Sequence, residues 1–303
     1  MFVPYDFGQC IVCKERVPGD PEHVIPEVIG GRLTAKLLCD KCNHDFGSAI
    51  VSKLKTDASI RLAVENLRDV IPDFAERFLK RAEYIARAGD GSQIRLTRSS
   101  EGLRVLAGKG ADDSIVLDTE EALGALATKL RRAGLDESGI LELQDLFLKA
   151  GEDEPVHLPT GDTFMRRPLP SPVPYLGTDS LDERFWALLA LEFMALIIGK
   201  QVFRASLDSI RGTILGLEQE ASVSIAYYSA GSRYDPFHVL RLVPGQDTLT
   251  VEIRLFRWLV THVNFEWIGY EGPHPVYVED LAYARSYFAP DVEYAEENRW
   301  MRF

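Results

Sequence analysis

The period of the apolar residues changes several times along the chain, and each change predicts a different secondary structure. Short apolar runs at 24–25 and 33–38 lie on either side of Gly30 and Gly31, which predicts two strands joined by a turn. From 46 to 54 the apolar residues recur every three to four positions, as they do on one face of a helix. The N-terminal stretch is therefore predicted to fold as strand, strand and helix.

The middle of the chain mixes helical and alternating patterns. Apolar faces at 60–67 and 74–85 predict two helices, and short alternating runs between 93 and 117 predict a small antiparallel meander. Thr119 has the side chain of an N-cap for the next helix, and apolar spacing predicts one more helix at 140–148.

The last part of the chain begins with a proline-rich stretch. Six prolines without sustained periodicity predict an ordered linker or long loop at 151–178. The most apolar stretch follows and predicts helices at 185–203 and 207–217. Alternating positions then predict strands at 223–227, 239–243 and 249–265, with Gly245 to Asp247 as a hairpin connection. The acidic and aromatic tail to Phe303 carries no clear pattern.

These elements predict an α+β protein in which a small module precedes a larger region of mixed helices and antiparallel sheet. The expected segments are the module at 1–58, a helical region with a small β meander at 59–150, the linker at 151–178 and an α+β C-terminal domain at 179–303.

Composition places the chain among ordinary soluble globular proteins, with 46% apolar and 26% charged residues. The longest apolar run, at 185–198, is interrupted by Glu192 and is shorter than the roughly 20 residues that cross a bilayer. We therefore expect a buried helix and no membrane span. The N-terminus has no basic stretch followed by an apolar one, which favours a cytoplasmic location.

The net charge of −12 argues against broad, non-specific affinity for nucleic acid. The acidity is uneven, because residues 1–100 carry 15 Lys and Arg against 14 Asp and Glu, whereas residues 101–303 carry 19 against 32. A nearly neutral N-terminal part can still bind phosphate through a divalent metal and through Arg32, Lys36 and Lys41. Without such a substrate, these three side chains would form a solvated face.

All four cysteines of the chain form two close pairs, Cys10 with Cys13 and Cys39 with Cys42. Two residues separate the cysteines of each pair, which lets a turn present both thiolates to one tetrahedral ion. Disulfides are the alternative, but the absence of a secretory leader favours a reducing compartment and therefore a metal. We predict a structural Zn²⁺ held by the four thiolates.

Three residues near the cysteines have the chemistry that phosphodiester hydrolysis requires. The reaction needs a base that deprotonates water near neutral pH, and His23 has a suitable side chain. It also needs a divalent metal that stabilises negative charge on phosphate oxygens, and Glu22 and Asn43 offer ligands for one. Zinc would hold the turn with His23 against the helix start with Asn43. No comparable group occurs later, where the histidines are scattered: His157, His238, His262 and His274.

Residues 7–55 resemble the zinc-bearing HNH endonucleases, a ββα-metal nuclease family. The resemblance rests on Cys10-x2-Cys13, Glu22-His23-Val24-Ile25-Pro26, Gly30-Gly31 and Leu38-Cys39-x2-Cys42-Asn43. It implies that His23 is the general base, that Asn43 and Glu22 bind a catalytic Mg²⁺ or another divalent ion, and that the substrate is DNA, with RNA less favoured.

Two positions depart from the family pattern. Thr34 stands where the family has a middle asparagine, so the strand there would be held differently. The last motif position is Asn43 rather than the commoner histidine, and the neighbouring His44 is an alternative metal ligand. Non-catalytic interpretations stay open as well: His23 as a structural histidine, Glu22 as a surface carboxylate and Asn43 as a helix cap.

The leading hypothesis is a metal-dependent endonuclease that hydrolyses DNA, in a setting such as bacterial defence or restriction. The competing hypothesis is a non-catalytic zinc-clamped module that binds nucleic acid or protein, which the net charge and Thr34 favour. A third is a nuclease that stays inactive until a regulatory ligand or a homo-oligomer assembles its site through the C-terminal region.

Overall fold

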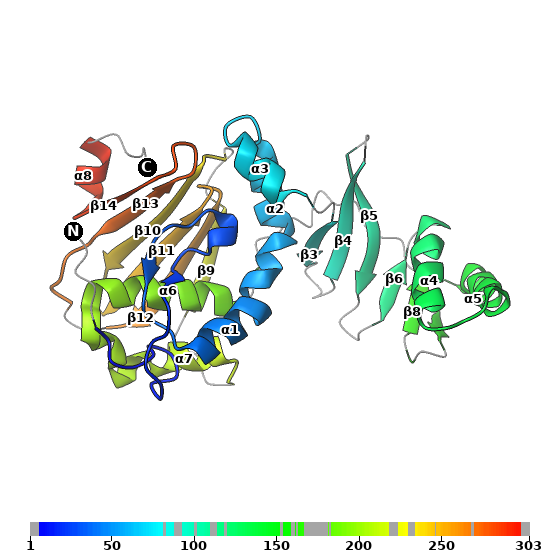
Figure 1. The fold of residues 1–303 in the computed structure, drawn as a ribbon, viewed down its shortest axis with the longest axis horizontal. Helices are drawn as coiled ribbons and strands as arrows, with labels where there is room; N and C mark the ends of the chain where they lie inside the picture. Colours follow the sequence, from blue (N-terminus) through cyan, green and yellow to red (C-terminus); the bar gives the residue numbers. More distant parts are fainter. Residues whose placement is uncertain are drawn as a thin grey trace. The chain divides into compact units, whose positions relative to one another are not determined.

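The fold is that of a computed structural model, in which the chain forms two compact units (Figure 1). Unit 1 consists of Met1–Lys55, Ile60–Lys80 and Leu181–Phe303, and unit 2 of Thr56–Ser59 and Arg81–Ser180. The structure describes residues 6–80, 83–87, 93–99, 102–109, 114–117, 120–151, 154–158, 161, 163–166, 181, 183–217, 224–229, 234–245, 247–267 and 270–297. Helices and mainly antiparallel sheets occupy separate segments, so the fold is α+β, as predicted.

The N-terminal module of unit 1 is a ββα arrangement, as predicted. The strand β1 (Glu22–His23) pairs with β2 (Thr34–Ala35) in an antiparallel ladder, and α1 (Asp40–Ala49) follows. The short 3₁₀ helix η1 (Glu27–Ile29) lies in the connection between the two strands. After α1 the chain continues through η2 (Val51–Lys55), α2 (Ala58–Asn66) and α3 (Pro72–Phe78).

The first strand lies at Glu22–His23, two residues before the predicted 24–25, and the second, Thr34–Ala35, is shorter than the predicted 33–38, because other groups take backbone hydrogen bonds beyond the two strands. The N–H groups of Leu37 and Leu38 donate to the Glu22 carboxylate, each at 3.0 Å, instead of extending the ladder. Pro26 has no N–H to donate and leads directly into η1. The helix α1 begins earlier than the expected 46, directly after Cys39.

The C-terminal part of unit 1 is a six-stranded antiparallel sheet with the order β14-β13-β10-β11-β12-β9. Its strands are β9 (Ser224–Ser229), β10 (Phe237–Pro244), β11 (Thr248–Leu255), β12 (Leu259–Glu266), β13 (Val276–Asp280) and β14 (Arg285–Ala289). The Gly245 N–H donates to the Thr248 carbonyl across 2.7 Å, which confirms the predicted hairpin between β10 and β11. The tail without a sequence pattern supplies β13, β14 and the helix α8 (Val292–Glu297).

The core of unit 1 is built around α6 (Glu183–Ile198), which packs against α7 (Asp208–Leu215), β11 and β12. Ile11 and Ile25 of the N-terminal module belong to the same hydrophobic cluster as Trp186 of α6. Within the described residues, Glu183–Phe203 is long and apolar enough to cross a membrane, but 83% of an apolar stretch of 18 residues within it is buried inside the protein. The predicted buried helix is therefore confirmed as the central element of the core.

Unit 2 contains a second six-stranded sheet, with the order β3-β4-β5-β6-β8-β7 and one parallel pair, β6 with β8. Its strands are β3 (Glu83–Arg87), β4 (Gln93–Ser99), β5 (Gly102–Lys109), β6 (Ile115–Leu117), β7 (Pro155–His157) and β8 (Thr163–Arg166). The helices α4 (Glu120–Arg132) and α5 (Glu137–Lys149) pack on it, with Leu130, Phe147 and Phe164 in their shared core. The predicted meander between 93 and 117 is confirmed.

The elements expected at 74–85 and at 151–178 also differ in the structure. The helix predicted at 74–85 ends at Phe78, because Tyr84 and Ala86 pair with β4 in the sheet of unit 2. The stretch at 151–178 contains β7 and β8, and Pro155 is tolerated as the first residue of an edge strand. Thr119 and residues 167–178 lie outside the described residues.

Candidate functional site

The four cysteines form one compact cluster. Their Sγ atoms all lie within 4.8 Å of one another, and those of Cys13 and Cys39 are 3.8 Å apart. Four sulfurs at about 2.3 Å from a central zinc in a tetrahedron are separated by about 3.8 Å, whereas a disulfide brings two sulfurs to about 2 Å. The cysteines are free thiols, so their geometry fits zinc.

The pKa shifts of the cysteine thiols also indicate a site that favours a bound cation. Hydrogen bonds from Cys42 and from backbone amides lower the pKa of Cys10 to about 4, against the effect of burial. The hydrogen bond to Cys10, burial and the negative charge of Cys10 raise the pKa of Cys42. A second thiolate beside the first is therefore unfavourable without a positive ion, and a divalent metal removes this penalty.

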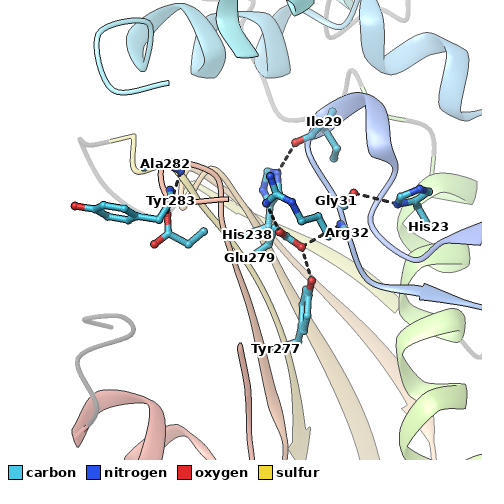
Figure 2. Close-up of polar contacts among 10 residues, drawn as sticks. His23, Ile29, Gly31, Arg32, His238, Tyr277, Glu279, Ala282 and Tyr283 are labelled. Carbon is cyan, nitrogen blue, oxygen red and sulfur yellow. Dashed lines mark hydrogen bonds and ion pairs between the residues drawn. The ribbon is translucent and has the colours of Figure 1, made fainter. Parts of the chain in front are cut away.

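His23 lies on β1 with its ring turned to the loop that follows η1 (Figure 2). Its Nδ1 is 3.0 Å from the carbonyl oxygen of Gly31. A carbonyl can only accept, so Nδ1 carries the hydrogen and the neutral ring has its lone pair on Nε2. The side chain is half-buried. This tautomer is the one that can take a proton at Nε2.

Glycine is required at both positions that shape this loop. Gly30 has φ of 100°, and a Cβ atom there would lie 2.4 Å from Cδ2 of Leu281. A Cβ atom at Gly31 would lie 1.8 Å from the carbonyl oxygen of Ile25. The two glycines thus allow a close approach of backbone segments that any side chain would prevent.

We expect Gly31→Ala to destabilise the protein by about 1–3 kcal/mol, because backbone atoms must move to admit the methyl group. Denaturant unfolding of purified protein measures the change. Gly47→Ala is the matched control: Gly47 lies in α1 with nothing within 4 Å of its Cβ position. Alanine is favoured in helices by about 0.5–1 kcal/mol, so this variant should be at least as stable as the wild type. Equal stability of the two variants would contradict the close contact.

Glu22 lies inside the module rather than at its surface, with 7% of the residue exposed. Oε1 accepts from Leu37 and Leu38, while Oε2 is buried without a hydrogen-bond partner in the described part of the chain. Burial raises its pKa to about 7. Glu192 of α6 is also buried, and its pKa is raised by burial and by the charges of Glu22 and Cys10. The interpretation of Glu22 as a surface carboxylate is wrong.

Glu22 and His23 are neighbours on a strand, where successive side chains point to opposite faces. The carboxylate therefore points toward the connection between β2 and α1, and the imidazole toward Gly31. An exposed ion could reach Oε2 only after a rearrangement of this segment.

Asn43 lies in the first turn of α1, directly after Cys42. Its N–H donates to the carbonyl of Cys39 at 2.9 Å, and Cys39 is the N-cap residue, so Asn43 is not the helix cap. The side chain is half-buried, whereas that of the neighbouring His44 is exposed. The position of Asn43 is thus fixed by a helix whose start carries two cysteines of the cluster.

The three predicted phosphate-binding residues have different surroundings. Arg32 donates from its backbone N–H and from Nη1 to the carboxylate of Glu279, at 3.1 and 2.8 Å. Lys41 pairs with Asp45 on the same helix face, at 2.5 Å. Lys36 is exposed between β2 and α1. Two of the three cations therefore already contact a carboxylate.

Residues of the C-terminal sheet contact the loop beside His23, and sequence analysis did not identify them. His238 and Glu279 lie more than 200 residues after Ile29 and Arg32, which they bind. No spacing rule links positions so far apart in sequence. The pairing of β10 with β13 brings His238 and Glu279 together. This pairing could not be predicted, because the C-terminal tail has no sequence pattern that indicates β13.

Residues 10–59 match the family model described as HNH endonuclease. Comparison with curated proteins and with solved structures gives no match. The matched segment includes the four cysteines, His23 and Asn43. Its family implies a nuclease-type hydrolase with a nucleic-acid substrate. Residues 10–59 are therefore similar to the HNH endonucleases, and this segment has four cysteines positioned to bind a zinc ion.

Proposed function

We propose that the protein is a metal-dependent endonuclease that cuts DNA, with RNA as the less favoured substrate. The observation that carries this proposal is the hydrogen bond between Nδ1 of His23 and the carbonyl of Gly31, in a segment that matches the HNH endonucleases. This bond leaves Nε2 of His23 to accept a proton. In the proposed reaction Nε2 takes a proton from a water molecule and the resulting hydroxide attacks the phosphorus atom. The bond from phosphorus to one ester oxygen breaks, and that oxygen leaves and takes a proton from solvent.

A divalent ion, Mg²⁺ or a similar metal, would stabilise negative charge on the phosphate oxygens when bound. Asn43 and His44 are the ligands we propose for it, because both lie in the first turns of α1 and neither is fully buried. The buried carboxylate of Glu22 instead supports the chain before Cys39 by binding the N–H groups of Leu37 and Leu38. Lys36 is the proposed phosphate contact.

A non-catalytic interaction module is the second candidate, and one observation favours it. Arg32 and Lys41 are paired with Glu279 and Asp45, so less positive charge is available to hold a nucleic-acid backbone than the sequence suggests. Catalysis and binding can be separated experimentally because the nuclease needs a second, exchangeable metal.

The test is plasmid nicking by the zinc-loaded protein in a titration with Mg²⁺ or Mn²⁺. We expect nicking that requires the added ion, and Asn43→Ala should need at least about ten times more metal for half-maximal activity, since it lacks a ligand. Ser48→Ala, on an exposed position of the same helix, should behave like the wild type. A folded protein with bound zinc that cuts neither DNA nor RNA in any metal would favour the interaction module.

We propose bacterial defence or restriction as the biological setting. The reason for this proposal is the domain arrangement, in which a nuclease-like module is joined to a larger region that could recognise a target. Expression in a bacterial host followed by phage plating tests it. Equal plaque numbers with the wild type and with His23→Ala would argue against a role in defence.

A further inference from the structure

The carbonyl group that accepts the hydrogen bond from His23 is that of Gly31. Gly31 lies in the segment 29–32, which we call the orienting loop. This loop begins at Ile29, the last residue of η1, passes through Gly30 and Gly31, and ends at Arg32 before β2. Because Gly31 accepts the hydrogen bond from Nδ1, any shift of the loop changes the direction of the His23 ring. The groups that hold the loop therefore determine where Nε2 points.

One end of the orienting loop is held by His238 of β10, which is fully buried. Its Nε2 lies 2.8 Å from the carbonyl oxygen of Ile29, and its Nδ1 accepts from the Phe256 N–H at 3.2 Å. The two partners fix the tautomer, with the hydrogen on Nε2. Burial lowers the pKa of His238 to about 4, so the ring is neutral at physiological pH and keeps both bonds.

The other end is held by Glu279 of β13, whose side chain is also fully buried. Its carboxylate accepts from the backbone N–H and from Nη1 of Arg32. The hydroxyl of Tyr277 donates to the same carboxylate, and burial raises the pKa of Tyr277, so this hydroxyl stays protonated. Charge-assisted bonds of this kind are about twice as strong as neutral ones.

The two anchors are one cross-strand pair. His238 and Glu279 are directly opposite each other on β10 and β13, so their side chains leave the same face of the sheet. Figure 2 shows both reaching the orienting loop, with His23 on the loop's other side. Leu281, just after β13, occupies the space where Gly30 would carry a Cβ atom. The sheet thus contacts the loop at Ile29, Gly30 and Arg32.

We propose that the His238–Glu279 pair positions the orienting loop and thereby aims the imidazole of His23, which makes both residues positioning residues of the nuclease. This inference rests on the proposed function for its catalytic part. It assigns to the C-terminal sheet a role in the reaction of the N-terminal module.

Two kinds of measurement test the proposal in the full chain. His238→Leu removes the N–H group that donates to the Ile29 carbonyl. His238→Gln keeps a side-chain N–H group at a similar distance from the backbone of residue 238. We expect His238→Leu to lower kcat for nicking by about 10–100-fold with KM unchanged, and His238→Gln to recover most of the loss. The wild type has six histidines, and His23→Gln identifies the signal of His23 in their ¹⁵N spectrum. In His238→Leu, which keeps the other five, the Nδ1–H signal of His23 should be altered.

The matched control is Val278→Ala, which shortens a buried side chain on the opposite face of β13. It should lower stability without changing kcat or the His23 signal. If Val278→Ala lowers kcat as much as His238→Leu at equal stability, the effect is only structural and the proposal fails. Wild-type kcat together with a wild-type His23 signal in His238→Leu also overturns it.

Glu279→Gln is the second variant if His238→Leu does not fold, because it keeps the size of the side chain and weakens its hold on Arg32. Its His23 signal is expected to change in the same way, and an unchanged signal counts against the proposal. If the wild type cuts no nucleic acid, the proposed function fails, and the His23 spectra still decide whether the sheet positions the ring.

Discussion

Cys10→Ser is expected to abolish tight zinc binding and to unfold the N-terminal module. Cys10 is fully buried, and its Sγ atom is one of four that can hold the ion. A structural zinc contributes an apparent free energy of about 10–16 kcal/mol in small zinc modules, which is as large as the whole net stability of about 5–15 kcal/mol of a typical domain. Loss of one ligand should therefore outweigh what packing alone can retain.

Metal analysis and thiol titration measure this effect without interference, because the chain has no other cysteine. We expect one zinc per chain in the wild type, four thiols that react only after a chelator is added, and no tightly bound zinc in Cys10→Ser. His44→Ala is the control, since His44 is exposed on α1 beside the cluster. A chelator that removes zinc without lowering the unfolding temperature would contradict a structural role for the metal.

The effect should extend beyond the module into the C-terminal sheet. Ile11, within the first cysteine pair, shares a hydrophobic cluster with α6, and its carbonyl accepts from the buried Arg211 of α7 at 2.7 Å. Glu22, beside the cluster, fixes the two residues before Cys39. Because these contacts belong to one core, zinc loss should lower the unfolding temperature of the sheet as well.

The elements that could be predicted from the sequence are those that local spacing determines. The two cysteine pairs are each close in sequence, and a knuckle turn alone brings their thiols together. The ββα order and the apolar helix at 185–203 follow from periods of a few residues. The alternation of side chains along a strand also places Glu22 and His23 on opposite faces, and this follows from their being neighbours in the sequence.

The turn between β11 and β12 illustrates what local patterns cannot supply. In this three-residue connection Phe256 and Arg257 both have positive φ, of 53° and 56°, a conformation that favours Gly, Asn or Asp. Tertiary contacts stabilise this conformation: Arg257 pairs with Asp235 at 2.6 Å, and the Phe256 ring packs edge-on against His238. The predicted continuous strand at 249–265 is broken there. The turn also presents the Phe256 N–H to His238, so an unexpected local structure supports the orienting loop.

His23→Ala is expected to reduce DNA nicking by about 10²–10⁴-fold, the contribution of a positioned general base. The half-buried ring bonds to Gly31 and lies opposite exposed Thr34, so its removal should cost less stability than Gly31→Ala. Zinc content should stay at one per chain, because the cysteine cluster is untouched. Initial nicking rates at saturating Mg²⁺ or Mn²⁺ measure the loss.

Two further results distinguish a base from a histidine that only supports the fold. Added imidazole should restore part of the rate of His23→Ala, because a free base can then deprotonate the attacking water, whereas it should not affect a merely destabilised enzyme. His274→Ala, which removes an exposed histidine of unit 1, should keep the full rate. If His23→Ala cuts as fast as the wild type, Nε2 of His23 is not the proton acceptor, and the hydrogen bond to Gly31 serves the structure of the loop alone.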